Sequence, residues 1–228
     1  MISSSIFLQL REMQVFKNLP DKELEGLSKE VKIKRYDKNA LIYECGENAD
    51  HVFAVLKGKV KMGINTSCGK ILIKNIIYPD AVFGENIFAS GSRRKEFAKT
   101  LTDTSVIMIP TAIFKTLVEE NQLFAADMAN LILQRLNNLE QRMQAFVFKK
   151  AKRRIVDFIK KIGSTKGIKI GIDEILVNHG MSHKEIAFLT DTSRQTVARV
   201  LGELKKDDLI FFSARKPNKI LIRNLSAL

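Results

Sequence analysis

The stretch "SHKEIAFLTDTSRQTVARVLGELKK", residues 182–206, decides the fold of the C-terminal part of this chain. Ser182 and Glu185 have the spacing of a capping box, in which each side chain bonds to the other residue's backbone N–H at the start of a helix. The polar run at residues 190–192 ends that short helix, and Ser193 offers an N-cap oxygen to a second one. The pattern therefore predicts two helices joined by a tight turn.

The second helix of this pair has two different faces at 100° per residue. One face is an apolar stripe of Val197, Val200, Leu201 and Leu204. The opposite face is narrow and consists of Gln195, Ala198, Arg199 and Gly202, with Arg194 at its N-terminal end. The small residues let another molecule approach closely, and Arg and Gln bind guanine and adenine edges bidentately in the DNA major groove. We expect Arg194, Gln195 and Arg199 to read base edges.

The segment after these helices, "DLIFFSARKPNKILIRN" (residues 208–224), has two apolar runs around a basic tip and predicts a β-hairpin. Helix, turn, helix and hairpin together form the winged helix-turn-helix arrangement. Residues 149–228 also hold eighteen Lys and Arg against eight Asp and Glu, a net +10 out of +13 for the whole chain. Such a basic domain attracts nucleic acid. We expect ten residues to contact double-stranded DNA: Ser182, His183, Thr192, Ser193, Arg194, Gln195, Thr196, Arg199, Arg215 and Lys216.

A long helix is predicted before this domain, because residues 111–148 contain neither glycine nor proline. Apolar residues recur in it at alternating spacings of 4 and 3, which is a heptad seam. The stripe could pack on its own domain, but a long seam with a polar remainder favours a helix that meets its own copy in a homodimer. The seam residues are Ala125, Ala129, Ile132, Leu136, Leu139, Met143 and Phe146. A basic amphipathic helix, "KKAKRRIVDFIKKIG", follows from residue 149, and we expect Gly163 to end it.

Residues from about 30 to 109 contain short Val- and Ile-rich runs separated by closely spaced glycines. This pattern is typical of strands and tight turns in a compact antiparallel roll or barrel. The expected fold class is therefore α+β. An N-terminal antiparallel β-roll, of the double-stranded β-helix or jelly-roll type, occupies residues 1–110. A dimerisation helix occupies 111–148, and a winged helix-turn-helix domain occupies 149–228.

Several classes of protein are excluded by the composition. No apolar run approaches the ~18 to 20 residues that span a bilayer, and the N-terminus lacks the early positive charge of a secretory signal, so we expect a cytoplasmic protein. Cys45 and Cys68 are too few and too isolated for a disulfide framework or a zinc site. No metal site is expected. The sequence has no Gly-rich phosphate loop, no recognisable catalytic triad and no HExxH motif, so we do not expect an enzyme.

Across nearly its whole length the chain resembles the Crp/Fnr family of bacterial transcription regulators. The family's usual S-R-x-T-V-x-R-x-L core is present at residues 193–201. The resemblance implies a β-roll sensor, a dimer helix and a winged helix-turn-helix, with Arg194, Gln195 and Arg199 as the base-reading residues. Position 195 is often glutamate in the family, which accepts from cytosine N4. Because this chain has glutamine there, we expect its operator to differ from the family's best-known site.

The sensor part resembles the family less completely. The segment "VFGENIF" keeps Gly84 and Glu85 of the family's phosphate-binding cassette, in which the glutamate binds a ribose hydroxyl of a cyclic nucleotide. The run that binds the cyclic phosphate in those receptors is Arg94-Lys95-Glu96 here, and a carboxylate beside a phosphate would repel it. Asn138 and Leu139 stand where the receptors have small hydroxyl residues that face the base. The candidate effector residues are Gly84, Glu85, Arg94, Lys95 and Asn138, for an effector other than a cyclic nucleotide; alternatively, Gly84 and Glu85 serve only the architecture of the roll.

Other effectors of the family are compared by the ligands that they need. Two cysteines exclude an iron–sulfur cluster. A haem sensor remains an alternative, with His51, His179, His183, Cys45 and several methionines as axial candidates and no spacing to choose among them. We expect His179 and His183 to lie at the surface. A small anion that binds near residues 93–95 is a further alternative effector, although this basic run is equally consistent with a solvated loop.

The expected mechanism is a shift in the seam that reorients two recognition helices on the half-sites of a palindromic operator, in response to an effector at the junction of roll and dimer helix. RNA polymerase is the expected protein partner. A cyclic-nucleotide- or haem-sensing version of the same regulator is one alternative. A roll without any ligand is another, and a regulatory subunit that acts on a protein partner is a third.

Overall fold

The computed structural model describes residues 2–65, 71–85, 88, 93–213 and 216–228. The chain forms two compact units, residues 1–136 and 137–228. The division falls inside the long helix α5 (Gln122–Phe148), between Leu136 and Asn137, and each unit is described by itself. The functional limits that the sequence suggests at residues 110 and 148 stay a prediction.

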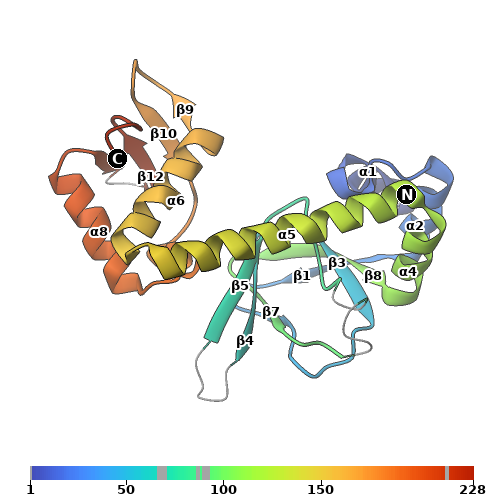
Figure 1. The fold of residues 1–228 in the computed structure, drawn as a ribbon. Helices are drawn as coiled ribbons and strands as arrows, with labels where there is room; N and C mark the ends of the chain where they lie inside the picture. The colour runs from blue at the N-terminus through green and yellow to red at the C-terminus, as the bar shows by residue number, and fades with distance from the viewer. Residues whose placement is uncertain (1, 66–70, 86–87, 89–92, 214–215) are drawn as a thin grey trace. The chain divides into compact units, whose positions relative to one another are not determined.

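The first unit is a roll of two four-stranded antiparallel sheets, preceded by helical segments (Figure 1). One sheet has the order β1-β8-β3-β6 and the other β2-β7-β4-β5. The helical segments are α1 (Ile2–Glu12), η1 (Gln14–Phe16) and α2 (Asp21–Glu30). The strands are β1 (Lys32–Tyr36), β2 (Leu41–Tyr43), β3 (His51–Lys57), β4 (Val60–Asn65), β5 (Ile71–Ile77), β6 (Val82–Phe83), β7 (Phe97–Thr100) and β8 (Thr104–Pro110).

Strand β3 shows how this unit builds two layers of core. Successive side chains of a strand point to opposite faces of the sheet. Phe53 and Val55 belong to the apolar cluster between the two sheets, whereas Val52 and Ala54 belong to the cluster shared with α1, α2 and the helices that follow β8. The sheet that contains β3 is therefore covered on both faces, and the cassette at Gly84 lies directly after its edge strand β6.

The predicted single helix over residues 111–148 is wrong in one respect, because it is broken at Asn121. Helix α4 (Thr111–Glu120) ends there, and α5 begins at the next residue. Asn121 has an extended backbone, and both its N–H and its side-chain Nδ2 donate to the Leu117 carbonyl, each at 3.1 Å. An asparagine side chain that competes for backbone acceptors in this way ends helices, even where no glycine or proline occurs.

The second unit combines the end of α5 with a winged helix-turn-helix. It contains α6 (Ala151–Lys166), β9 (Ile168–Lys169), β10 (Ile175–Asn178), α7 (His183–Leu189), α8 (Arg194–Lys206), β11 (Ile210–Ser213) and β12 (Lys216–Ile222). Its sheet has the order β11-β12-β10-β9. The α+β class predicted from the sequence, with its antiparallel roll, long helix and winged helix-turn-helix, is confirmed. Within the described ranges, no helix is long and apolar enough to cross a bilayer.

The expectation that Gly163 ends the basic helix is wrong. Helix α6 continues to Lys166, and Gly167 is its C-cap. A Cβ atom at Gly163 would lie 2.9 Å from both Ile222 Cδ1 and Leu225 Cδ1. The glycine therefore allows α6 to pack closely against the C-terminal end of the chain, and it has no role in ending the helix.

Candidate nucleic-acid interface and sensor site

The two helices of the C-terminal motif begin as their sequence predicts. Ser182 accepts from the Glu185 N–H at 3.3 Å, and Glu185 Oε2 accepts from the Ser182 N–H at 2.7 Å, which completes the capping box of α7. Ser193 Oγ accepts from the Thr196 N–H at 3.0 Å and caps α8. These hydroxyls occupy helix N-termini, where backbone N–H groups favour anions such as phosphate.

The two faces of α8 are also as predicted. Its apolar stripe is buried, with exposed fractions of at most 3%. The opposite face is exposed at Arg194, Gln195, Ala198, Arg199 and Gly202. A Cβ at Gly202 would meet no atom within 4 Å, so space is open above this face. The face thus presents two arginines and a glutamine, with only small side chains between them.

Arg199 is not free on this face. Its Nη1 donates to Glu203 Oε1 at 2.5 Å, one helical turn away, and Lys152 Nζ of α6 lies 2.9 Å from Glu203 Oε2. These contacts lower the pKa of the Glu203 carboxyl, chiefly through the hydrogen bond from Lys152; desolvation opposes this, and the charges of Lys152 and Arg199 add to the lowering. Glu203 therefore holds the Arg199 guanidinium along the helix surface.

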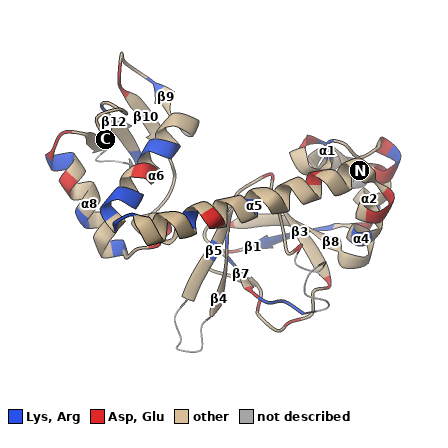
Figure 2. Cartoon of the chain, in the orientation of Figure 1, with Lys and Arg blue, Asp and Glu red and all other residues tan. Residues whose placement is uncertain are grey.

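The other predicted DNA-contacting residues lie around the ends of the two helices. Ser182 and Ser193 are exposed, and His183, Thr192 and Thr196 are half-buried. Lys216 is the first residue of β12, and Arg215 lies outside the described residues. Figure 2 marks Lys and Arg positions along α6 and α8 in this unit. Their roles in DNA binding stay a prediction.

In the roll, the structure brings Gly84, Glu85 and Arg94 together. Arg94 is only 5% exposed, so the idea that this basic run is a solvated loop is wrong for Arg94, although Arg93 and Lys95 are exposed. Arg94 Nη1 donates to the Gly84 carbonyl at 2.9 Å and Nη2 to the His51 carbonyl. A Cβ at residue 84, where φ is +84°, would lie 2.9 Å from Arg94 Nη1, so the turn requires glycine.

Aromatic rings line the other side of the Arg94 guanidinium. Its Cζ lies 4.2 Å from the centroid of Tyr43 and 5.6 Å from that of Phe53. Burial lowers the pKa of Arg94, against the raising effects of Tyr43 and Glu96. Burial also raises the pKa of the Tyr43 phenol, and the nearby Glu96 carboxylate adds to this increase. Arg94 is thus a buried residue that connects Gly84, His51 and Tyr43 within the roll.

Two ion pairs, each with a buried carboxylate, complete this cluster. Arg135 of α5 donates from Nη1 to Glu85 and from Nη2 to the Val82 carbonyl. Burial lowers the pKa of Arg135 to about 10, which leaves the guanidinium charged at neutral pH. Glu96 has a 3% exposed side chain and pairs with Lys74 Nζ at 2.6 Å.

Three buried atoms of the cluster have no hydrogen-bond partner among the described residues. They are Tyr43 Oη, Glu85 Oε2 and Arg94 Nε. Lys95 is exposed, and Asn138 is an exposed residue of the second unit. Sequence reasoning missed Tyr43, Lys74 and Arg135, because no local pattern marks a residue whose partner is distant in the sequence.

The histidines differ in their surroundings. The expectation of a surface position is wrong for His179, which is 8% exposed and whose Nδ1 accepts from the Met181 N–H at 3.1 Å. His51 begins β3 inside its sheet, and His183 is half-buried. Cys45 is exposed, and Cys68 lies outside the described residues. Among the residues that are described, no three His, Cys, Asp or Glu form a group that could hold a metal ion.

The seam of α5 is largely uncovered. Ala125 is half-buried and Ala129 is exposed, and the large side chains from Ile132 onward are between 41% and 65% exposed. The helix packs on the roll with other residues, chiefly Phe124 and Met128. The alternative in which the seam packs on its own domain is therefore not what the structure shows.

Comparison with known proteins matches both units to described families. Residues 33–121 match the model of the cyclic nucleotide-binding domain, and residues 153–228 match the Crp-like helix-turn-helix domain. The "CRP-like cAMP-activated global transcriptional regulator" of Mycobacterium tuberculosis is 22% identical over 190 residues, which cover 83% of this chain and 84% of that protein. The "Global nitrogen regulator" of Synechocystis is 26% identical over 188 residues, covering 81% and 82%.

Solved structures share the fold. A mutant of CooA from Carboxydothermus hydrogenoformans superposes with a TM-score of 0.75 and 24% identity, covering 89% of this chain and 88% of that one. FixK2 from Bradyrhizobium japonicum gives a TM-score of 0.72 with 23% identity, covering 86% and 94%. The curated relatives are transcription regulators and not enzymes. With both domain types matched in this order along the chain, the protein belongs to the Crp/Fnr family of transcription regulators.

Proposed function

We propose that this protein is a homodimer that binds a palindromic operator, with α8 of each subunit in the major groove. The observation that supports this most directly is the exposed face of α8, where Arg194, Gln195 and Arg199 are separated only by small side chains. Arginine and glutamine at the start of such a helix fit the edges of guanine and adenine. The capped helix N-termini and the basic wing suit the flanking phosphates.

The uncovered seam of α5 supports the dimer. Soluble proteins rarely leave a regular row of large apolar side chains in water. A second copy of α5 would cover both rows at once, because a two-fold interface uses the same surface on each subunit. A dimer with two recognition helices reads a near-symmetric site with half-sites about one helical turn apart.

The roll would bind the effector at the buried cluster, and we propose that this effector is not a cyclic nucleotide. Some relatives are named for activation by cAMP. In this chain, however, Arg94 Nη1 and Nη2 each donate to a roll carbonyl, those of Gly84 and His51, and the buried Glu96 carboxylate lies near enough to act on the pKa of Arg94. A cyclic phosphate would have to share Arg94 with these two carbonyls, and the Glu96 carboxylate, although paired with Lys74, would repel it. Calorimetric titration with cAMP and cGMP should show no saturable heat, and clear saturation would contradict this part of the proposal.

The DNA-binding proposal is tested by selecting bound duplexes from a random pool at about 0.15 M salt, a physiological ionic strength. Recovery of one palindrome is expected. The Arg194→Ala variant should then lose about 1 to 3 kcal/mol of discrimination between the operator and its single-base variants. Lys205→Ala removes the same charge from the far end of α8, and it should weaken all sequences alike. Recovery of unrelated sequences that bind only through charge would contradict the proposal.

The dimer is tested separately by mass. Sedimentation of the wild-type protein should give a dimer, and Leu139→Glu, which places a charge in the seam, should give monomers. Gln144→Glu introduces the same side chain at an exposed position outside the seam and should leave the dimer intact. A wild-type monomer at the concentrations used for DNA binding would contradict a pre-formed dimer.

A further inference from the structure

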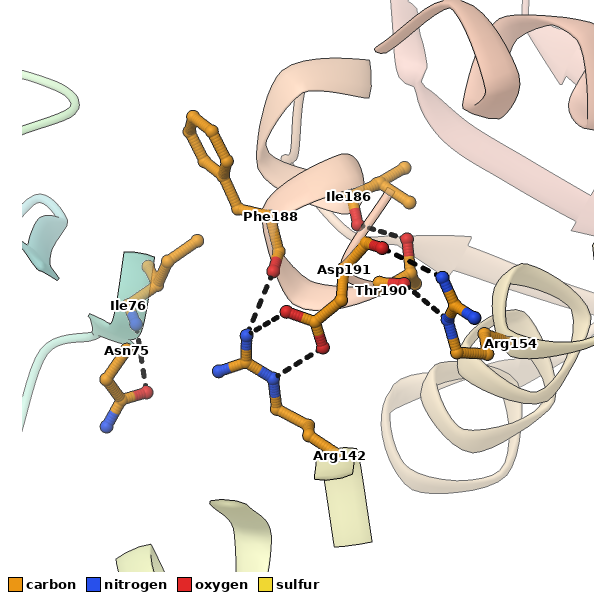
Figure 3. Close-up of polar contacts among 8 residues, drawn as sticks. All are labelled: Asn75, Ile76, Arg142, Arg154, Ile186, Phe188, Thr190 and Asp191. Carbon is orange, nitrogen blue, oxygen red and sulfur yellow. Dashed lines mark hydrogen bonds and ion pairs between the residues drawn. The ribbon is translucent and has the colours of Figure 1, made fainter. Parts of the chain in front are cut away.

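The turn between α7 and α8 is held by an arginine that lies outside the helix-turn-helix. Arg142 of α5 donates from Nη2 to Asp191 Oδ1 at 2.6 Å and from Nε to Asp191 Oδ2 at 3.2 Å (Figure 3). The same Nη2 also donates to the Phe188 carbonyl of α7 at 3.2 Å. Arg142 thus binds a side chain of the turn and the end of the preceding helix together.

A second arginine, Arg154 of α6, binds the backbone of the same turn. Its Nε donates to the Thr190 carbonyl at 2.9 Å and its Nη2 to the Asp191 carbonyl at 2.8 Å, and Figure 3 shows it approaching from the side opposite to Arg142. Its Nη1 donates to the Lys149 carbonyl at 2.7 Å, just after α5. The two guanidinium groups therefore connect the turn to the corner between α5 and α6.

The turn also has bonds of its own, since the Thr190 N–H and hydroxyl both donate to the Ile186 carbonyl. Asp191 has φ of +49°, in the left-handed region that Asp tolerates better than most residues other than glycine. The side chains of Arg142 and Asp191 are each only 22% exposed, so both charges are largely removed from water. Removing one partner of such a pair leaves the other charge poorly compensated, which costs more than losing a surface ion pair.

Arg142 also lies at the edge of the seam. At 100° per residue it is about 60° from Leu139 and about 40° from Phe146 around α5. In heptad terms it occupies a g position, which in coiled coils normally pairs with the facing helix and sets partner choice. Here the residue at the g position, Arg142, forms its hydrogen bonds with Asp191 and Phe188 in the helix-turn-helix of its own chain. A rotation of α5 about its axis at the dimer interface would therefore act directly on the turn.

From these contacts we infer that Arg142, assisted by Arg154, is a positioning residue for operator recognition. The pair fixes the turn before α8 to the helix that contains the seam, so the separation and direction of the two recognition helices follow from the packing of α5 against its copy. This inference rests on the proposed function. It assigns a role to Arg142 and Asp191 that neither base contacts nor phosphate contacts would provide.

The test uses charge-removing variants that keep the local shape. Asp191→Asn retains a residue that tolerates positive φ, and Arg142→Gln retains a hydrogen-bonding side chain. Arg142→Lys keeps the charge but cannot make the two-point contact, and it serves where the glutamine variant does not fold. The matched control is Arg153→Gln, which removes the same charge from a side chain that is 59% exposed and paired with Asp157 one turn away.

The measurement is affinity for the selected operator and for two versions with one base pair added or removed between the half-sites. One base pair turns the second half-site by about 35°, so a dimer with fixed recognition helices discriminates strongly among the three. The Arg142 and Asp191 variants should lose about 3- to 30-fold of operator affinity and most of the spacing discrimination. The double variant should be no worse than the poorer single one, because both remove the same contact.

Thermal unfolding and sedimentation are measured alongside, to separate positioning from folding. A merely structural role would lower affinity for all three spacings by the same factor, in step with lower stability, and would overturn the inference. The inference would also be overturned if the Arg142 and Asp191 variants kept the same operator affinity and spacing discrimination as Arg153→Gln. If the wild-type protein selects no palindrome at all, the proposed function itself fails, whatever the variants do.

Discussion

The two units of this protein differ in the exposure of their charged side chains. In the roll, Glu85, Arg94 and Glu96 are at most 7% exposed and lie in one cluster with Tyr43 and Arg135. On the recognition helix, Arg194, Gln195 and Arg199 are exposed. A buried charge must be paired because its desolvation is costly, whereas an exposed one can exchange water for a phosphate or a base at little cost. Substitutions in the roll should therefore change stability first, and substitutions on α8 should change binding first.

The largest expected effect is at Arg135. The Arg135→Ala variant leaves the Glu85 carboxylate buried without its partner and should lower the free energy of unfolding by about 3 to 5 kcal/mol. Arg153→Ala removes an exposed member of an ion pair and should cost no more than about 1 kcal/mol. Urea denaturation of both variants measures this difference. Similar losses of unfolding free energy in Arg135→Ala and Arg153→Ala would show that the buried charge contributes no more to stability than the exposed one.

Two helical glycines sharpen the comparison within the second unit. Gly163→Ala should lower the free energy of unfolding by up to about 2 kcal/mol, because displacing the ends of the Ile222 and Leu225 side chains costs more than the ~0.5 to 1 kcal/mol that alanine gains in a helix. Gly202→Ala should raise it by about 0.5 to 1 kcal/mol, because that helix position is open and alanine is the better helix former. Thermal unfolding of the two variants decides this. Destabilisation by Gly202→Ala would mean that the face of α8 is covered within the monomer.

The smallest effect concerns Tyr43. Its phenol has no hydrogen-bond partner among the described residues, so Tyr43→Phe should change the free energy of unfolding by less than about 1 kcal/mol near neutral pH. Burial raises the pKa of the phenol in the folded state. The folded protein thus resists its ionisation, and this contribution to stability is complete below the unfolded pKa of about 10 and is lost as the pH rises further.

Urea unfolding near pH 8 and near pH 11, on either side of that unfolded value, tests this point. The wild-type protein should lose more stability between the two pH values than Tyr43→Phe does. Tyr36→Phe, at a half-buried position on β1, is the control and should behave like the wild-type protein. Equal alkaline losses in all three proteins would show that the Tyr43 hydroxyl ionises as readily in the folded chain as in the unfolded one.

The same contrast explains what could be predicted from the sequence. The caps at Ser182 and Ser193 and the two faces of α8 depend on residues three or four apart, and these features were predicted in detail. The cluster in the roll depends on Lys74 and Glu96, 22 residues apart, and on Glu85 and Arg135, 50 residues apart. No local pattern contains such pairs. The ion pair between Arg142 and Asp191, which are 49 residues apart, could not be predicted for the same reason.

Two smaller errors also have physical causes. Gly163 suits a helix end by its backbone freedom, but it serves close packing against residues far along the chain. Asn121 interrupts the helix between Thr111 and Phe148 through its own side-chain hydrogen bond, which the absence of glycine and proline does not reveal. No helix was predicted before β1, where α1 and α2 together provide several members of the first core cluster.

Arg135 and Arg142 stand seven residues apart on α5, one bonded to the roll at Glu85 and the other to the turn at Asp191. Seven residues return to nearly the same side of an α-helix, within about 20°. Both arginines therefore occupy g positions of consecutive heptads, on the same edge of the seam. Inserting or deleting a whole heptad would keep both arginines on one edge of the seam, whereas a single-residue insertion would turn one of them by about 100°.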